Sequence, residues 1–246
     1  MNRMSDNPDT HWRGNDLSVQ VLFTAAGVAQ QIWIDSGSGG LLVDVGDGTL
    51  RDMLTEGLNP RGVTGVVITH GHFDHVGGLH SLLGYLRMVG RDQPLEVIAP
   101  KNCTEMLGIV ENFHRSYPDS IPFRVNIHEL GDRETFGCAG MTIEAFDVIH
   151  CGSVSGSGVM APIPANGYRI SSADETVAIS GDTGSNADLE ALVKDADLAI
   201  IEATYSDGYD VAQEALRNVH LSERLASELG KLAKHHILVH RIRKYP

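Results

Sequence analysis

The segment that most constrains this chain is THGHFDHVGG, at residues 69–78. It places His70, His72, Asp74 and His75 directly after the apolar, strand-like run GVVIT. Imidazole nitrogens are ligands for zinc, iron and similar metals, and a carboxylate can join them or bridge two ions. A strand end that runs into a loop and then a helix can turn two of these side chains to one side and two to the other. We therefore predict a site for two adjacent metal ions.

Two ions need about seven or eight protein ligands, so further ligands must come from other parts of the chain. His150, Asp182 and His240 share one position: each lies at or just beyond the C-terminal end of an apolar run that is predicted to be a strand. That shared position favours them over His114, His128, His235 and His236, which we interpret as surface or core residues.

Asp44, in the run LLVDVGDG, is a candidate partner for one of these ligands. Histidines that bind a metal usually donate their other ring N–H to a carboxylate or carbonyl. The alternative is a plain turn aspartate before Gly46.

Short runs rich in β-branched residues predict strands, and apolar residues at steps of three and four predict helices. The predicted strands are 18–24, 30–35, 40–45, 65–69, 95–99, 141–149, 176–180, 197–203 and 236–240, and the predicted helices are 78–90, 186–196 and 221–235. A strand meander followed by alternating strands and helices indicates an α/β chain whose sheets are covered by helices. Residues 151–166, rich in Gly, Ser and Pro, are predicted to be a loop.

The bulk properties limit the class of protein. A chain of 246 residues without linkers or repeats suits one domain, which we place at 17–246 after a polar lead-in at 1–16. Its net charge of −13 disfavours non-specific binding to many phosphates. Without an apolar leader or a membrane span, and with three cysteines at unrelated spacing, the chain is expected in the cytoplasm. Cys103 and Cys138 are interpreted as small apolar core residues.

The order HxHxDH, then a lone His, then an Asp in a GDT turn, then a late His resembles the metallo-β-lactamase superfamily, from about residue 18 onward. The resemblance implies an α/β (α+β) fold, a four-layer αββα sandwich with the metals along one edge between the sheets. It implies that His70, His72 and His150 hold the first ion, that Asp74, His75 and His240 hold the second, and that Asp182 bridges both. Zinc is the first choice of metal, with manganese or iron as alternatives.

Several motifs are most similar to the ribonuclease Z branch, the tRNA 3′-processing phosphodiesterases. They are AAGV (25–28), DVGDGTLRDML (44–54), GDTG (181–184), IEATY (201–205) and HLSE (220–223). In that branch a Glu and a His assist proton transfer at the leaving group, which implies this role for Glu202 and His220. The alternative for His220 is a residue at a helix N-terminus. Members of the branch often form homodimers.

The chain also departs from this branch. The long basic arm expected between His150 and Asp182 is absent: residues 151–166 contain no Lys or Arg. Arg241 and Ile242 follow His240 where the branch carries a Phe and a Ser. Arg241 and Lys244 either meet a phosphate or are solvated charges.

The function that we predict is hydrolysis of a phosphodiester, RNA or a small cyclic phosphodiester, by water activated between two metal ions. Asp74 would orient that water or take its proton, and Glu202 with His220 would help to protonate the departing oxygen. The alternatives are lactone, thioester or lactam hydrolysis on the same metals, iron-based redox chemistry, and a binding protein without catalysis.

Overall fold

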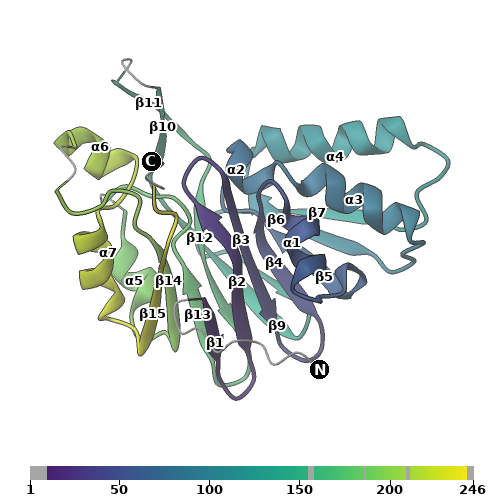
Figure 1. Ribbon diagram of the computed structural model, residues 1–246, viewed down its shortest axis with the longest axis horizontal. Helices are drawn as coiled ribbons and strands as arrows, with labels where there is room; N and C mark the ends of the chain where they lie inside the picture. Colours follow the sequence, from purple (N-terminus) through teal and green to yellow (C-terminus); the bar gives the residue numbers. More distant parts are fainter. Residues whose placement is uncertain (1–9, 155–157, 186, 209–210, 243–246) are drawn as a thin grey trace.

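Two β-sheets lie face to face in the computed structural model, which describes residues 10–154, 158–185, 187–208 and 211–242 (Figure 1). The first sheet has the order β1-β2-β3-β4-β5-β6-β7, and the second has the order β15-β14-β13-β12-β9-β8. The strands of the first sheet are β1 (His11–Arg13), β2 (Ser18–Ala25), β3 (Ala29–Asp35), β4 (Gly40–Val45), β5 (Val63–Val67), β6 (Leu95–Pro100) and β7 (Val125–Leu130). Those of the second are β8 (Thr135–Cys138), β9 (Met141–Asp147), β12 (Asn166–Ser171), β13 (Thr176–Ile179), β14 (Leu198–Glu202) and β15 (His235–Val239).

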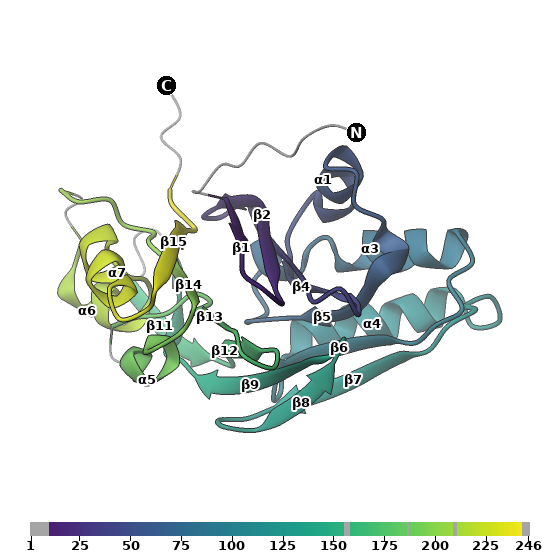
Figure 2. The ribbon, with the colours of Figure 1, turned by 90° about the horizontal axis from the view of Figure 1, so that it is seen from below.

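Helices cover the outer faces of both sheets, so the molecule has four layers (Figure 2). The helices of the first half are α1 (Thr49–Thr55), α2 (Phe73–Val76), α3 (Leu79–Met88) and α4 (Thr104–Ser116); those of the second half are α5 (Leu189–Val193), α6 (Gln213–Asn218) and α7 (Glu223–Gly230). One apolar core fills the space between the sheets, a second lies under α1, α3 and α4, and a third lies under α5 and α7. The predicted αββα sandwich is confirmed.

The direction of the strands creates the functional edge. Strands β4 to β7 are parallel in the first sheet, and β13, β14 and β15 are parallel in the second. The carboxyl ends of parallel strands meet at the same edge of a sheet, where loops gather side chains for binding. The two sheets are joined at this edge, because Asn166 N–H donates to the carbonyl of Thr69 at 2.9 Å.

The structure corrects three of the sequence predictions. The expected loop at 151–166 contains a β-hairpin, β10 (His150–Val154) and β11 (Gly158–Ile163), which projects from the body of the molecule (Figure 1). The lead-in at 1–16 contains β1, which pairs with β2. The third predicted helix ends at Gly230 instead of residue 235, and Leu232 is left 39% exposed.

Other predictions are confirmed or extended. The predicted stripe Leu79, Leu82, Leu83 and Leu86 is buried on α3. Cys103, Cys138 and Cys151 are free and buried, and burial raises the pKa of both Cys103 and Cys138 to about 11. Among the described residues no helix is both long and apolar enough to span a membrane.

Candidate metal centre

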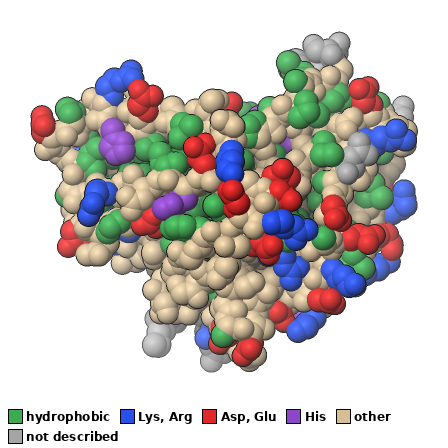
Figure 3. Space-filling model, turned by 180° about the vertical axis from the view of Figure 1, so that it is seen from behind, with side chains coloured by type: hydrophobic (Ala, Val, Ile, Leu, Met, Phe, Trp, Pro, Cys, Tyr) green, Lys and Arg blue, Asp and Glu red, His purple; other side chains and the backbone are tan. Residues whose placement is uncertain are grey.

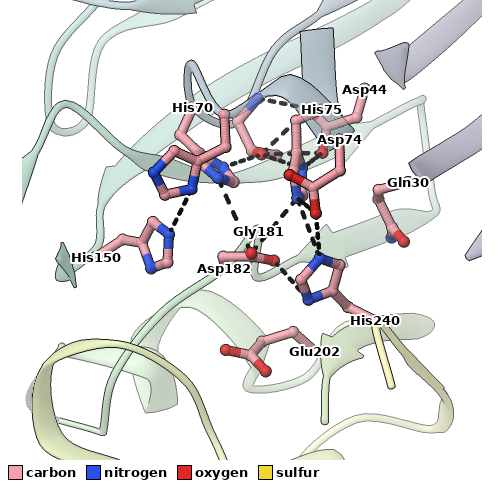
Figure 4. Close-up of polar contacts among 12 residues, drawn as sticks. Gln30, Asp44, His70, Asp74, His75, His150, Gly181, Asp182, Glu202 and His240 are labelled. Carbon is pink, nitrogen blue, oxygen red and sulfur yellow. Dashed lines mark hydrogen bonds and ion pairs between the residues drawn. The ribbon is translucent and has the colours of Figure 1, made fainter. Parts of the chain in front are cut away.

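All seven predicted ligands converge at the carboxyl edge of the two sheets. Figure 4 labels all of these side chains except His72. His70 follows β5, and Asp74 and His75 lie on the short helix α2. His72 is the N-cap residue of this helix. His150 begins β10, Asp182 follows β13, and His240 follows β15.

Two groups of side chains can each hold one ion. In one group, His70, His72 and His150 present ligand atoms that lie within 4.8 Å of one another. In the other, Asp74, His75 and His240 do the same. Asp182 lies between the groups: its Oδ2 is 3.9 Å from His70 Nε2 and 3.4 Å from His75 Nε2, and its Oδ1 is 3.3 Å from His240 Nδ1. The seven side chains therefore lie close enough together to hold two ions, and the assignment of each to an ion stays a prediction.

The hydrogen bonds of the first group leave lone pairs directed at its centre. His150 Nδ1 donates to the carbonyl of Val219 at 2.8 Å, so its Nε2 carries the lone pair in the neutral ring. That Nε2 is 3.1 Å from Nδ1 of His72. His70 Nε2 is buried and has no hydrogen-bond partner. A buried polar atom without a partner is costly in an apo protein, and a metal ion bound by these nitrogens would satisfy all three.

The charges in the first group suit a metal. Burial lowers the pKa of His72, lowers that of His70 well below its ordinary value and lowers that of His150 to about 4. These imidazoles are therefore neutral at physiological pH, which is the protonation state that binds a metal.

In the second group, nearby carboxylates stabilise the protonated form of His75. Burial would lower the pKa of His75, but Asp182 and Asp44 outweigh it and raise that pKa well above its ordinary value. Burial would raise the pKa of Asp74, yet its bond with His240 and the charge of His75 lower it to about 2. A divalent ion can supply this positive charge in place of the proton on His75.

Residues behind the ligands hold them in position. Asp44 Oδ2 accepts a hydrogen bond from His75 Nδ1 at 2.7 Å, as predicted, and Asp44 Oδ1 accepts from Thr69 N at 2.8 Å. The backbone N–H of Gly27, in the turn between β2 and β3, donates to Asp74 Oδ2 at 2.8 Å. Thr69 and Gly27 were not predicted. Their roles depend on the fold, although Thr69 adjoins His70 in sequence.

Glu202 and His220 form a pair beside the ligands. Glu202, the last residue of β14, is 1% exposed, and its Oε1 accepts from Nδ1 of His220 at 3.0 Å. Backbone N–H groups of Thr183 and Leu221 donate to the same oxygen. Burial would lower the pKa of His220, but Glu202 outweighs it and raises that pKa to about 9. His220 Nδ1 is 3.8 Å from Asp182 Oδ2, so the Glu202–His220 pair lies beside the candidate metal centre.

The remaining candidates lie elsewhere. Arg241 donates to Glu223 at 2.6 Å, so its guanidinium already forms an ion pair. Lys244 lies outside the described residues. His114, His235 and His236 are exposed, and His128 pairs with Glu96 at 2.6 Å, so the structure brings none of these four into the ligand groups.

Two curated relatives and one solved structure are informative. Ribonuclease BN from Cronobacter sakazakii is 31% identical over 58% of this chain, but the match covers only 42% of the relative, so the chain spans under half of that protein. Ribonuclease Z from Staphylococcus aureus is 27% identical over 83% of this chain and 78% of the relative. The short form of human tRNase Z has the same fold, with a TM-score of 0.74 and 23% identity over 92% of this chain and 93% of that one.

The match to a protein family covers most of the chain. Residues 34–240 match the family described as the beta-lactamase superfamily domain, and this range contains every predicted ligand from His70 to His240. Together with the four-layer sandwich and the carboxyl-edge site, this match shows that the chain belongs to the beta-lactamase superfamily and has the metallo-β-lactamase fold.

Proposed function

We propose that this chain is a metal-dependent phosphodiesterase of the ribonuclease Z type. The observation that carries the proposal is the Glu202–His220 pair beside Asp182, because a leaving alkoxide must be protonated and a positioned imidazole can donate that proton. Hydrolysis of a lactam, lactone or thioester is the alternative on the same ligands, and parallel assays with such substrates test it.

The residues present fit two divalent ions, with zinc as the first choice. His70, His72 and His150 would hold one ion, Asp74, His75 and His240 the other, and Asp182 both. When bound, the ions would acidify water near neutral pH and act as Lewis acids on the phosphoryl group.

The side chains would divide the remaining work. Asp74, held by the N–H of Gly27 and 3.2 Å from His240 Nε2, would orient the attacking water. Glu202 would hold the ring of His220 through Nδ1, which leaves Nε2 of His220 to give its proton to the departing oxygen. Glu202 is suited to this fixed role because its two oxygens accept five hydrogen bonds.

The substrate is RNA or a smaller phosphodiester. The relatives named ribonuclease Z favour RNA. The β10–β11 hairpin favours a small substrate, because residues 150–163 carry no Lys or Arg and Met160 on this hairpin is 53% exposed. On the face opposite Figure 1, basic side chains are interspersed with acidic ones instead of forming one patch (Figure 3). A homodimer stays a prediction.

The experiment compares substrates that differ in their leaving group. Bis-p-nitrophenyl phosphate releases a weakly basic phenolate, whereas a dinucleotide, a cyclic nucleotide or a tRNA precursor releases a basic alkoxide. His220→Ala should lower kcat by about 10²- to 10⁴-fold on the alkoxide substrates and far less on the phenolate. Asp182→Ala should abolish turnover of every substrate.

His128→Ala is the matched control, because His128 also pairs with a glutamate, Glu96 at 2.6 Å, but away from the metal centre. It should leave all rates unchanged. Equal losses for His220→Ala on both leaving groups would contradict the proton-donor role, and full turnover by Asp182→Ala would overturn the two-metal site. Rapid hydrolysis of a lactone or thioester without phosphodiester turnover would select the alternative class.

A further inference from the structure

The hydroxyl of Thr204 is the point where the two parts of the site meet. Thr204 follows β14, and only 3% of its surface is exposed. Its Oγ1 lies 2.8 Å from Glu202 Oε2, 2.9 Å from the carbonyl oxygen of His240 and 3.0 Å from Nδ1 of the same histidine. One oxygen therefore touches both the Glu202–His220 pair and a proposed metal ligand.

The count of donors and acceptors determines where the hydrogen atoms lie. A threonine hydroxyl has one hydrogen to donate and two lone pairs that accept. A carboxylate and a backbone carbonyl only accept, and both lie closer to Oγ1 than Nδ1 does, so we assign the single Thr204 hydrogen to Glu202, the shortest of the three contacts. The hydroxyl can then only accept from Nδ1 of His240. That nitrogen must carry the hydrogen, and Nε2 of a neutral His240 carries the lone pair.

A second contact of His240 Nδ1 agrees with this assignment, because Asp182 Oδ1 lies 3.3 Å from it and can only accept. On the other side of the ring, Nε2 lies 3.2 Å from Asp74 Oδ2 and 3.3 Å from Nε2 of His75, inside the second ligand group, where a bound metal ion would take its lone pair. The backbone of His240 has φ of 56°, an unfavourable left-handed conformation for a residue with a side chain, and its N–H donates to Thr24 Oγ1 at 2.6 Å. Two threonines thus contact His240: Thr24 accepts from its backbone N–H, and Thr204 lies against its carbonyl oxygen and its ring.

We propose that Thr204 is a positioning residue that fixes His240 in the tautomer with Nδ1 protonated and ties this ring to Glu202 and His220. The link between the two parts of the site runs from His240 Nδ1 through the hydroxyl to Glu202 Oε2, and from Glu202 Oε1 to His220 Nδ1. Its consequence for zinc rests on the proposed role of His240 as a ligand. The tautomer itself does not.

The first measurement uses the metal-free wild-type chain. Long-range proton–nitrogen NMR of ¹⁵N-histidine-labelled protein distinguishes the two tautomers of each neutral ring, and a His240→Asn sample identifies the His240 signals. We expect the hydrogen on Nδ1. A hydrogen on Nε2 alone would overturn the proposal, whatever the substrate of the enzyme proves to be.

The second measurement compares zinc affinities by competition with a chelator. Thr204→Val keeps the shape of the side chain and removes the hydroxyl, and it should weaken binding of one zinc ion about 10- to 100-fold. Thr204→Ser restores the hydroxyl and should bind within a few-fold of wild type.

Thr49→Val is the matched control. Thr49 is fully buried, and its hydroxyl donates to the carbonyl of Gly46 at 2.8 Å, but the described contacts of that hydroxyl include no proposed ligand. It should lose stability without a change in zinc affinity. If Thr204→Val and Thr49→Val bound zinc equally well, or if Thr204→Ser were as weak as Thr204→Val, Thr204 would have no positioning role. If Thr204→Val does not fold, the serine variant and the wild-type tautomer decide.

Discussion

Each end of strand β13 has a buried carboxylate, and the two carboxylates have different kinds of partner. Glu175 precedes the strand and is 6% exposed, and Asp182 follows it and is 3% exposed. Three consecutive backbone N–H groups donate to Glu175, from Asn15 at 2.5 Å and from Asp16 and Leu17 at 2.9 Å. The described ion-pair partners of Asp182 are all imidazoles, at 3.3 to 3.9 Å.

This difference separates a structural carboxylate from a proposed metal ligand. Glu175 has fixed donors that no ligand could improve, and it fastens the segment before β2 to the turn between β12 and β13. Asp182 faces the rings of proposed ligands, and among them Nε2 of His70 is buried without a hydrogen-bond partner. A buried carboxylate needs positive charge beside it. In the metal-free chain His75 can supply that charge, because Asp182 and Asp44 outweigh burial and raise its pKa, and a bound divalent ion can supply it instead. The comparison predicts that the Asp182 end responds to metal and that the Glu175 end does not.

The largest expected effect concerns metal binding. Zinc at 100 times its dissociation constant should stabilise wild type by about 2.7 kcal/mol and raise Tm by about 5–10 °C. Asp182→Asn removes the charge shared by both ligand groups and should abolish this shift, whereas Glu175→Gln should keep it. Calorimetry of the metal-free chains with and without zinc measures both. A full zinc shift in Asp182→Asn would remove the distinction between the two carboxylates.

The sequence predicted which side chains converge at the carboxyl edge better than it predicted the strands around them. The seven proposed ligands stand out in the sequence because each carries metal-binding chemistry and either follows an apolar strand or lies in the HxHxDH segment. Strands β7, β8 and β12 were missed because their side chains alternate poorly: on β7, for example, only Leu130 is buried. Pairing with β6 and β9, and not local propensity, makes these segments strands.

The supporting contacts could not be read from the sequence for a different reason. Thr69 and Asp44 are 25 positions apart, and Thr204 and His240 are 36 apart, and nothing in either local pattern reveals the partner. Asp44 and His240 also adopt left-handed φ values of 57° and 56°, which the surrounding fold imposes. Ligand identity is therefore local information, whereas ligand orientation is a property of the assembled sheets.

A smaller effect, a loss of folding stability, is expected at Glu175, which precedes β13. Glu175→Gln keeps the size of the side chain but replaces an oxygen that accepts from Asp16 and Leu17 by an amide that cannot. Hydrogen bonds to a charged group contribute more than neutral ones, so the free energy of unfolding should fall by about 1–3 kcal/mol. Urea denaturation of the metal-free chain measures this loss. Glu190→Gln, an exposed change on α5, is the control and should cost far less.

The smallest effect is the pH dependence of that loss. Burial would raise the pKa of Glu175, but the backbone donors from Asn15, Asp16 and Leu17 outweigh it, so the pKa lies below its ordinary value of 4.5. A carboxyl whose pKa is depressed by folding stabilises the protein above its unfolded pKa, and this stability disappears as pH falls through the folded pKa. The difference between wild type and Glu175→Gln should therefore be constant near neutrality and shrink below pH 4.5. Urea denaturation at a series of pH values measures it. A difference that persisted unchanged in acid would mean that Glu175 acts through shape and not through charge.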